Sequence, residues 1–227
     1  MNSAIKLIMP LCFSLSLNAM EFKTESVGDI PFARAAQQIL CLKLAKYPLY
    51  KGTQQERETL ECRERGLRDK DELERYVKQV ATALALDANF KKPTDSDLKQ
   101  FPVRYLELEG NELADLPESL GDLAGELTSL DISCNQFEKF PAIVSKLTSL
   151  TDLNIANFDL ELQKDNLKAL TNLTRLTLSS KMQNQFDASN LPFVNYEKSK
   201  EEVSDWRNTC HGNMRYVTYK KNINSKK

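Results

Sequence analysis

The sequence contains few of the residues from which metal sites and most hydrolase sites are built. His211 is the only histidine among 227 residues, and no Cys-x-x-Cys pair occurs, which excludes a zinc site of the usual Cys/His composition. A glycine-rich phosphate loop, an HExxH motif and a GxSxG motif are absent as well. We therefore expect no bound metal, no cofactor and no enzymatic activity.

Strong net charge and long apolar runs are also missing. The formal net charge is −1, so no overall field draws the chain toward nucleic acid or an anionic membrane. The apolar stretch Leu7–Leu17 has eleven residues, fewer than the ~18–20 that a bilayer span needs. Charged residues make up 28% of the chain and hydrophobic residues 41%, as is typical of a soluble globular protein. The composition predicts neither a nucleic-acid partner nor a stable membrane anchor.

Residues 1–19 have the outline of a secretory signal peptide. Lys6 gives the first segment its single cation, Leu7–Leu17 forms the apolar region, and Ala19 offers a small residue for cleavage. We expect cleavage near Ala19 and export to the periplasm or out of the cell, followed by a linker over residues 20–30. The alternative is a buried or amphipathic N-terminal segment of an intracellular protein.

Cleavage near Ala19 would leave four cysteines, at Cys41, Cys62, Cys134 and Cys210. Four thiols permit three pairings, and sequence alone does not choose among them. Cys41 and Cys62 fall on adjacent expected helices, which makes them the favoured disulfide candidate. Cysteines that serve only as small buried hydrophobic residues are the alternative.

One apolar pattern recurs four times between residues 103 and 186. The copies start at Val103, Leu127, Leu150 and Leu173, which are 24, 23 and 23 residues apart. Each follows L-x-x-L-x-L, and the first two continue to Asn111 and Asn135. The third copy has Phe158 at that position and Asn157 one residue early, so we expect the row of asparagines to weaken toward the C-terminus.

This pattern resembles the L-x-x-L-x-L-x-x-N-x-L signature of the leucine-rich repeat family over about 85 residues. The resemblance implies an α/β fold, a short solenoid of about four repeats over residues 102–190, with a parallel sheet on its concave side. In that family the asparagines bond to backbone groups in a ladder. Pro117 and Pro141 would open the convex segments. The wall opposite the sheet would be formed by Leu113, Leu116, Leu120 and Leu123 in the first repeat and by Phe137, Phe140, Val144 and Leu147 in the second.

Residues 31–101 predict a helical module before the repeats. The apolar spacing from Phe32 to Leu40 predicts one helix. A capping box at Thr53–Glu56 predicts a second helix, which carries Leu60 and ends near Gly66. A third follows Asp69–Glu72, with an apolar stripe from Leu73 to Leu84. We expect the module to cover the exposed end of the array, although it could also be an independent recognition surface.

Residues 191–227 are expected to form a C-terminal cap and a basic tail. Glu197–Trp206 predicts a short helix in which Val203 and Trp206 cover the far end of the array. A tryptophan that serves as a ligand platform is the alternative. The stretch Trp206–Lys227 carries basic residues and no acidic one, which indicates a solvated tail or a docking segment for anionic lipid or RNA.

The candidate binding residues are the strand positions that point away from the core. They are Tyr105, Glu107, Glu109, Ser129, Asp131, Ser133, Asp152, Asn154, Arg175 and Thr177, with Ala156 and Ser179 on the same face. Glu107, Asp131, Asn154 and Thr177 form one column, with neighbours about 4.8 Å apart. Adjacent acids carry a small repulsive cost. We therefore expect the N-terminal half of this face to bind a basic or hydroxyl-rich surface, and a solvated acidic face without a partner is the alternative.

The resemblance favours an exported protein–protein interaction module whose partner protein and oligomeric state the sequence does not specify. The chain is similar to small exported bacterial repeat proteins, some of which act on host proteins. An intracellular scaffold or adaptor is one alternative. Another is a ubiquitin-ligase-like effector with Cys210 as its nucleophile, but only about 40 residues follow the array, too few for such a domain.

Overall fold

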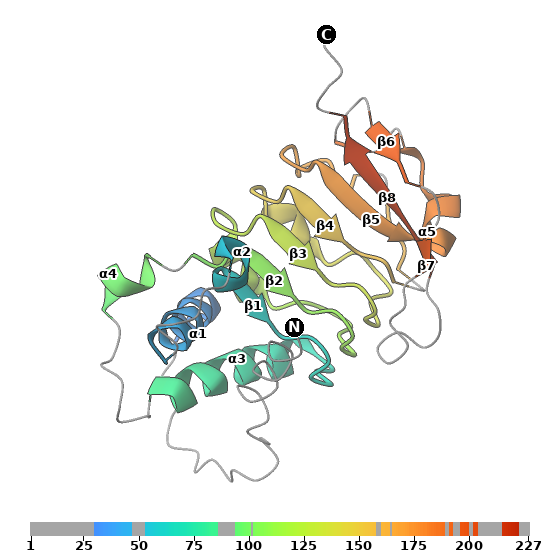
Figure 1. Ribbon diagram of the computed structural model, residues 1–227. Helices are drawn as coiled ribbons and strands as arrows, with labels where there is room; N and C mark the ends of the chain where they lie inside the picture. The colour runs from blue at the N-terminus through green and yellow to red at the C-terminus, as the bar shows by residue number, and fades with distance from the viewer. Residues whose placement is uncertain are drawn as a thin grey trace, which may run out of the picture.

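The computed structural model describes residues 30–46, 53–85, 94–100, 102–157, 160–163, 165–188, 191–192, 196–199, 202–203 and 215–222. The strands are β1 (Thr59–Glu61), β2 (Tyr105–Glu107), β3 (Ser129–Asp131), β4 (Asp152–Asn154), β5 (Arg175–Ser179), β6 (Tyr196–Lys198), β7 (Glu202–Val203) and β8 (Arg215–Lys221). They form one mostly parallel sheet of order β1-β2-β3-β4-β5-β8-β6, with β7 also paired to β8 (Figure 1). The α/β class expected from the sequence is confirmed.

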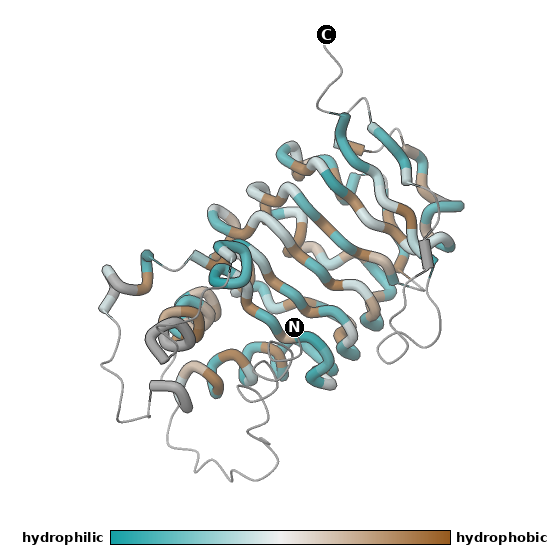
Figure 2. Tube along the Cα trace, viewed as in Figure 1, coloured by the Kyte–Doolittle hydropathy of each residue, from teal (hydrophilic) through white to brown (hydrophobic). Residues whose placement is uncertain are grey.

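The strands β2 to β5 pair in parallel at equivalent positions of the four sequence copies. Leu106, Leu130, Leu153 and Leu176 are successive Cα partners, and each is at most 1% exposed. Figure 2 shows apolar residues at matching positions on neighbouring strands. Side chains alternate between the two faces of a strand, so the residues beside each leucine point to the opposite face. The spacing of the leucines therefore sets the register of the sheet.

Strand β1 was not expected, and it corrects the predicted second helix over 53–66. The capping box at Thr53 is present, but the helix that it opens, α2 (Gln54–Arg57), has a single turn before the chain enters β1. β1 pairs in parallel with β2, and Leu60 lies opposite Leu106, 46 residues later, which is twice the 23-residue repeat spacing. Residues 59–61 form a strand because pairing with the free edge of β2 satisfies the backbone groups of that edge.

The segment after β1 is a degenerate copy of the repeat. Leu60, Cys62 and Leu67 are buried and have the spacing of the later apolar positions, while Arg65 stands where the others have asparagine. With one leucine and the asparagine replaced, the copy lacks the pattern that identifies the others.

Two helices cover the β1 end of the sheet (Figure 1). α1 (Phe32–Lys46) packs against α3 (Lys70–Ala85), and it also contacts β1, the short helix α4 (Asp95–Leu98) and the 3₁₀ helix η4 (Glu118–Leu123). The buried faces of the two long helices consist of Phe32, Ala35, Ala36, Ile39 and Leu40 from α1 and Leu73, Val77 and Ala81 from α3. The expected first and third helices are confirmed.

The wall opposite the sheet is built from short 3₁₀ segments. η4 and η5 (Ala142–Lys146) follow Pro117 and Pro141, whose φ angles of −66° and −62° suit the start of such a segment. All eight residues expected on this wall are buried, from Leu113 to Leu147. They join the leucines of the strands in one continuous core.

The asparagine ladder is present and extends further than expected. Asn111 accepts hydrogen bonds from the backbone N–H of Arg65 and Leu67 (2.9 and 3.2 Å) and donates to the carbonyls of Cys62 and Leu108 (2.8 and 2.9 Å). Each of these bonds satisfies a backbone group at the turn that follows a strand.

Asn135 and Asn157 repeat this role along the stack. Asn135 accepts from Leu113 N and donates to the carbonyl of Leu108, whereas Asn157 accepts from Asn135 N and donates to the carbonyl of Ile132. The expected weakening at the third copy is wrong, because Asn157 is fully buried and its one-residue offset is absorbed by a shorter turn.

The backbone just before the ladder residues has a positive φ in three copies. Glu64, Gly110 and Cys134 have φ angles of 52°, 70° and 55°, and all three occupy the same repeat position. Residues with a side chain enter this region at a cost of roughly 1–2 kcal/mol. In the third copy Ala156 has no positive φ, in keeping with its shorter turn. The shared conformation at residue 64 identifies the β1 segment as structurally equivalent to the later copies.

The C-terminal region continues the sheet, which corrects two expectations. Tyr196–Lys198 and Glu202–Val203 are strands, so the helix expected over Glu197–Trp206 is wrong in its described part. β8 lies antiparallel to β5, and the residues 215–221 are therefore not a solvated tail. Their period-2 alternation places Val217 and Tyr219 in the core, where they cover the open edge of β5. Trp206, Cys210 and His211 lie outside the described residues.

No disulfide joins Cys41 to Cys62, so this candidate pairing is wrong. Cys41 lies on α1, whereas Cys62 follows a strand and occupies an inward position of the degenerate copy. Burial raises the pKa of the Cys62 thiol to about 12, which keeps it protonated. Cys134 is disulfide-bonded. The expected signal peptide and almost all of the 20–30 linker lie outside the described residues, and within the described part no helix is long and apolar enough to cross a membrane.

We expect Asn111→Ala to lower the free energy of unfolding by at least about 3 kcal/mol. The N–H groups of Arg65 and Leu67 and the carbonyl of Cys62 lose their hydrogen bonds, at ~1–3 kcal/mol each, while the carbonyl of Leu108 keeps the bond from Asn135. Chemical denaturation followed by circular dichroism measures this difference. Asn184→Ala, on the exposed face of α5 (Ser180–Gln185), is the control and should change it by less than about 0.5 kcal/mol. Equal losses in both variants would contradict the role given to the ladder.

The shared positive φ predicts opposite effects at two equivalent positions. Gly110→Ala should destabilise by roughly 1 kcal/mol, because alanine enters the left-handed region with strain. Glu64→Gly should leave stability unchanged or raise it by up to about 1 kcal/mol, because glycine relieves that strain. Thermal denaturation of both variants checks the signs, and a loss in Glu64→Gly as large as that in Gly110→Ala would count against structural equivalence.

Candidate functional site

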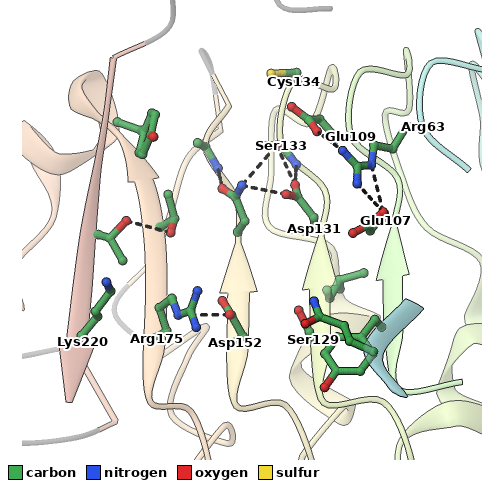
Figure 3. A pocket seen from close by; sticks show the side chains of 18 residues that line it. Arg63, Glu107, Glu109, Ser129, Asp131, Ser133, Cys134, Asp152, Arg175 and Lys220 are labelled. Carbon is green, nitrogen blue, oxygen red and sulfur yellow. Dashed lines mark hydrogen bonds and ion pairs between the residues drawn. The ribbon is translucent and has the colours of Figure 1, made fainter. Parts of the chain in front are cut away.

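The outward face of the sheet forms one groove of about 390 Å³ (Figure 3). All ten candidate residues from the sequence line it, namely Tyr105, Glu107, Glu109, Ser129, Asp131, Ser133, Asp152, Asn154, Arg175 and Thr177. Ala156 lines it as well, whereas Ser179 is buried and donates to the carbonyl of Asn157 (2.8 Å). The sequence therefore identified the centre of the groove correctly.

The groove also includes residues that the sequence did not suggest. They are Gln55 and Arg63 at the first end, Tyr216, Thr218 and Lys220 at the last end, and Cys134 and Leu130 between them. Arg63 stands at the repeat position that Glu109 has in the next copy. Recognition of the degenerate copy would therefore have placed Arg63 in the groove. The residues of β8 carry a period-2 signal that the expectation of a solvated tail obscured.

The strand register arranges these side chains in two rows across the sheet. One row runs Glu107, Asp131, Asn154, Thr177 and Thr218, which are successive Cα partners from β2 to β8. The second row runs Tyr105, Ser129, Asp152, Arg175 and Lys220. The predicted column Glu107–Asp131–Asn154–Thr177 is confirmed, and the hydroxyls of Thr177 and Thr218 continue it with a 3.1 Å hydrogen bond.

Arg63 supplies a counter-charge to the acidic end of the groove. Its Nε and Nη2 donate to Oε2 of Glu107 at 2.9 and 2.6 Å, and its Nη1 lies 3.7 Å from Oε2 of Glu109. The adjacent acids Glu107 and Asp131 are therefore not the bare like-charged pair that the sequence suggested. One guanidinium offsets part of the repulsion among three carboxylates.

Asp131 is held in one orientation at the centre of the groove. Its Oδ1 accepts from the backbone N–H and hydroxyl of Ser133 (2.9 and 2.6 Å), and its Oδ2 accepts from the amide of Asn154 (2.9 Å). Burial raises the pKa of this carboxyl, and the hydrogen bonds from Ser133 and Asn154 oppose that effect. Its position is set by neighbours and needs no ligand.

Glu109 is a buried carboxylate with a strongly raised pKa. Its residue is 6% exposed, and burial together with the nearby charge of Asp131 raises its pKa to about 7, against the opposing effect of Arg63. Near neutral pH the side chain is divided between its charged and neutral forms. The charge of the acidic end therefore depends on pH in the physiological range.

The opposite end of the groove is basic. Nε of Arg175 lies 3.1 Å from Oδ2 of Asp152, and Lys220 is the Cα partner of Arg175 on β8 (Figure 3). Burial raises the pKa of Asp152, and Arg175 opposes this effect. The groove is thus polar along its whole length, with acids over β2 and β3 and cations over β5 and β8.

The groove offers hydrogen bonds and charge pairs to a polar surface. The described part of the chain has no cluster of three or more His, Cys, Asp or Glu residues suited to a metal. The groove carboxylates are engaged by Arg63, Ser133, Asn154 and Arg175. Its chemistry is that of charged, amide and hydroxyl groups fixed on a rigid sheet.

The buried Glu109 predicts a pH-dependent stability. A folded pKa of about 7 against an ordinary value of 4.5 means that the folded state binds more protons in this window, so stability is lost as pH rises from about 4.5 through 7. Glu109→Gln should remove this loss. The free energy of unfolding of the variant, relative to that of the original protein, should therefore rise by on the order of 2 kcal/mol from pH 5 to pH 8. Urea denaturation at both pH values measures it, with the exposed Glu112→Gln as control. An equal difference at pH 5 and pH 8 would contradict the assignment.

Sequence comparisons do not place the chain in a family. Neither a scan against protein-family models nor a search of curated proteins found a match. The function is therefore argued from the geometry of the groove and from the repeat pattern.

Proposed function

We propose that this chain is a leucine-rich-repeat protein that binds a partner protein in the groove of its sheet. The observation that carries the proposal is the groove itself, because ten outward residues from four sequence copies line one continuous polar surface. The asparagine ladder, the parallel register and the 3₁₀ segments support the assignment to this kind of repeat.

Binding to a preformed surface fits the rigidity of the groove. Its side chains stand on strands whose turns are fixed by Asn111, Asn135 and Asn157. A preformed surface loses little conformational entropy when it binds, and a few central side chains then carry most of the affinity. The partner contacts would be hydrogen bonds and charge pairs, because nearly all of the lining residues are polar.

Export of the protein remains part of this proposal. Residues 1–19 have the outline of a signal peptide, and Cys134 is disulfide-bonded. Disulfides persist mainly in oxidising compartments, which supports a location outside the cytoplasm. An intracellular scaffold would use the same groove, so the proposal for binding does not depend on the compartment.

Blocking the centre of the groove should abolish partner capture. Ser129→Arg places a long cation in the second row, between Tyr105 and Asp152. The described residues form no side-chain hydrogen bond with Ser129, so the fold should tolerate the change. Affinity capture followed by mass spectrometry should recover the specific partner at least about tenfold less with this variant, a loss of ~1.4 kcal/mol. Asp122→Arg, exposed on η4 on the opposite wall, is the control and should capture as the original protein does. Equal capture by all three proteins would overturn the proposal.

A further inference from the structure

Acidic and basic side chains lie at different ends of the groove, and a partner must match this distribution of charge (Figure 3). At its first end the carboxylates of Glu107, Glu109 and Asp131, together with Glu61, the Cα partner of Glu107 on β1, lie near a single cation, Arg63, which leaves a formal charge of −3 when all are ionised. At its last end Arg175 and Lys220 lie beside Asp152, and the exposed Glu197 of β6 is the Cα partner of Lys220, so the formal charges of this end cancel. The two ends lie on different strands of one rigid sheet, so their separation is fixed.

The acidic end retains acceptors that are not used inside the protein. Both strong hydrogen bonds from Arg63 go to Oε2 of Glu107, so Oε1 of Glu107 has no partner among the described residues. Glu109 is 6% exposed and receives no side-chain hydrogen bond within the described residues, its one contact being the 3.7 Å approach of Arg63. A buried carboxylate with spare acceptors is complementary to an ammonium or guanidinium group.

The basic end retains donors in the same way. Arg175 meets Asp152 through Nε, and no described residue pairs with its terminal nitrogens. Lys220 is exposed, lines the groove and forms no ion pair within the described residues. Neighbouring guanidinium and ammonium groups on paired strands are suited to a carboxylate.

The distance between the ends sets the spacing of the partner groups. The acidic end is centred on β2 and β3 and the basic end on β5 and β8, about three strand steps of ~4.8 Å away. Arg175 and Lys220 also lie two to four residues back along the strands, so the two ends are roughly 16–20 Å apart. An extended chain advances ~3.3–3.4 Å per residue, so a segment that crosses the strands diagonally covers this distance in about five to six residues. Ser129, Asn154 and Thr177 line the groove from β3 to β5, and the hydroxyl of Ser129 forms no hydrogen bond within the described residues.

We propose that the groove takes an extended peptide segment of its partner, with an arginine or lysine seated at Glu107, Glu109 and Asp131 and an aspartate or glutamate seated at Arg175 and Lys220, about five to six residues apart. This inference rests on the proposed binding function and specifies the chemistry of the partner. A uniformly basic surface would lose its attraction at the last end, and a uniformly acidic surface at the first.

Selection of random twelve-residue peptides displayed on phage against the full-length protein tests this pairing. We expect the enriched peptides to carry a basic and an acidic residue separated by about four or five others, and to lose binding to the Ser129→Arg variant. Glu109→Gln should remove the preference for the basic residue alone. Lys220→Gln should remove the preference for the acidic residue alone, whereas Lys221→Gln, on the same strand with its side chain on the other face, should change neither.

A charge exchange then tests direct contact. The best selected peptide should bind Lys220→Glu at least about fivefold more weakly than the original protein, and replacing its acidic residue by lysine should restore binding to that variant. Peptides that depend on Ser129 but show no charge order, or an exchange without recovery, would overturn this inference and leave the binding function intact. Failure to select any peptide that Ser129→Arg blocks would overturn both.

Discussion

The hydrogen bonds that satisfy the backbone at the end of each strand are the interaction on which the rest of the structure depends. A short strand must turn sharply into the opposite wall, and the turn buries N–H and C=O groups that have no strand partner. Asn111, Asn135 and Asn157 supply hydrogen-bond partners for these groups. Each asparagine bonds to the backbone of its own copy and to the backbone of the copy before it. Because the bonds cross between copies, they fix the position of every strand relative to its neighbour, and the leucine core then follows from the register.

The fixed register also determines what the outward face can do. Each inward leucine is the Cα partner of the leucine on the next strand, so the residues on either side of it also form straight rows. The chemical character of the face therefore varies across the strands of the sheet. One row changes from carboxylate through amide to hydroxyl, while the other has two cations on β5 and β8 before Glu197 on the edge strand β6. The polarity of the groove is thus a consequence of the repeat spacing combined with a gradual change of residue type.

The parts of the fold that could be predicted from the sequence are those in which local pattern and tertiary packing agree. Copies with an intact leucine pattern gave the strands β2 to β5, and the same alignment gave ten residues of the groove. The strand β1 was missed because its copy keeps only Leu60 and Leu67 of the leucines and has Arg65 in place of asparagine. Its helical start signal is real, but the unpaired edge of β2 outweighs it after one turn. The strand β8 was missed because basic residues dominate its exposed positions, although Val217 and Tyr219 alternate with them.

The strand that was missed at the first end changes the meaning of the helical module. If α1 and α3 only covered the end of a core, the outward face would begin at β2 with the uncompensated acids Glu107, Glu109 and Asp131. Instead the module is joined to a strand that places Arg63 within 2.6 Å of Glu107 and 3.7 Å of Glu109. Removing this cation would leave buried carboxylates facing one another in a region of low dielectric, where repulsion is strong. The end cap and the binding surface are therefore built from the same segment, and the alternatives of a cover and a recognition surface are not exclusive.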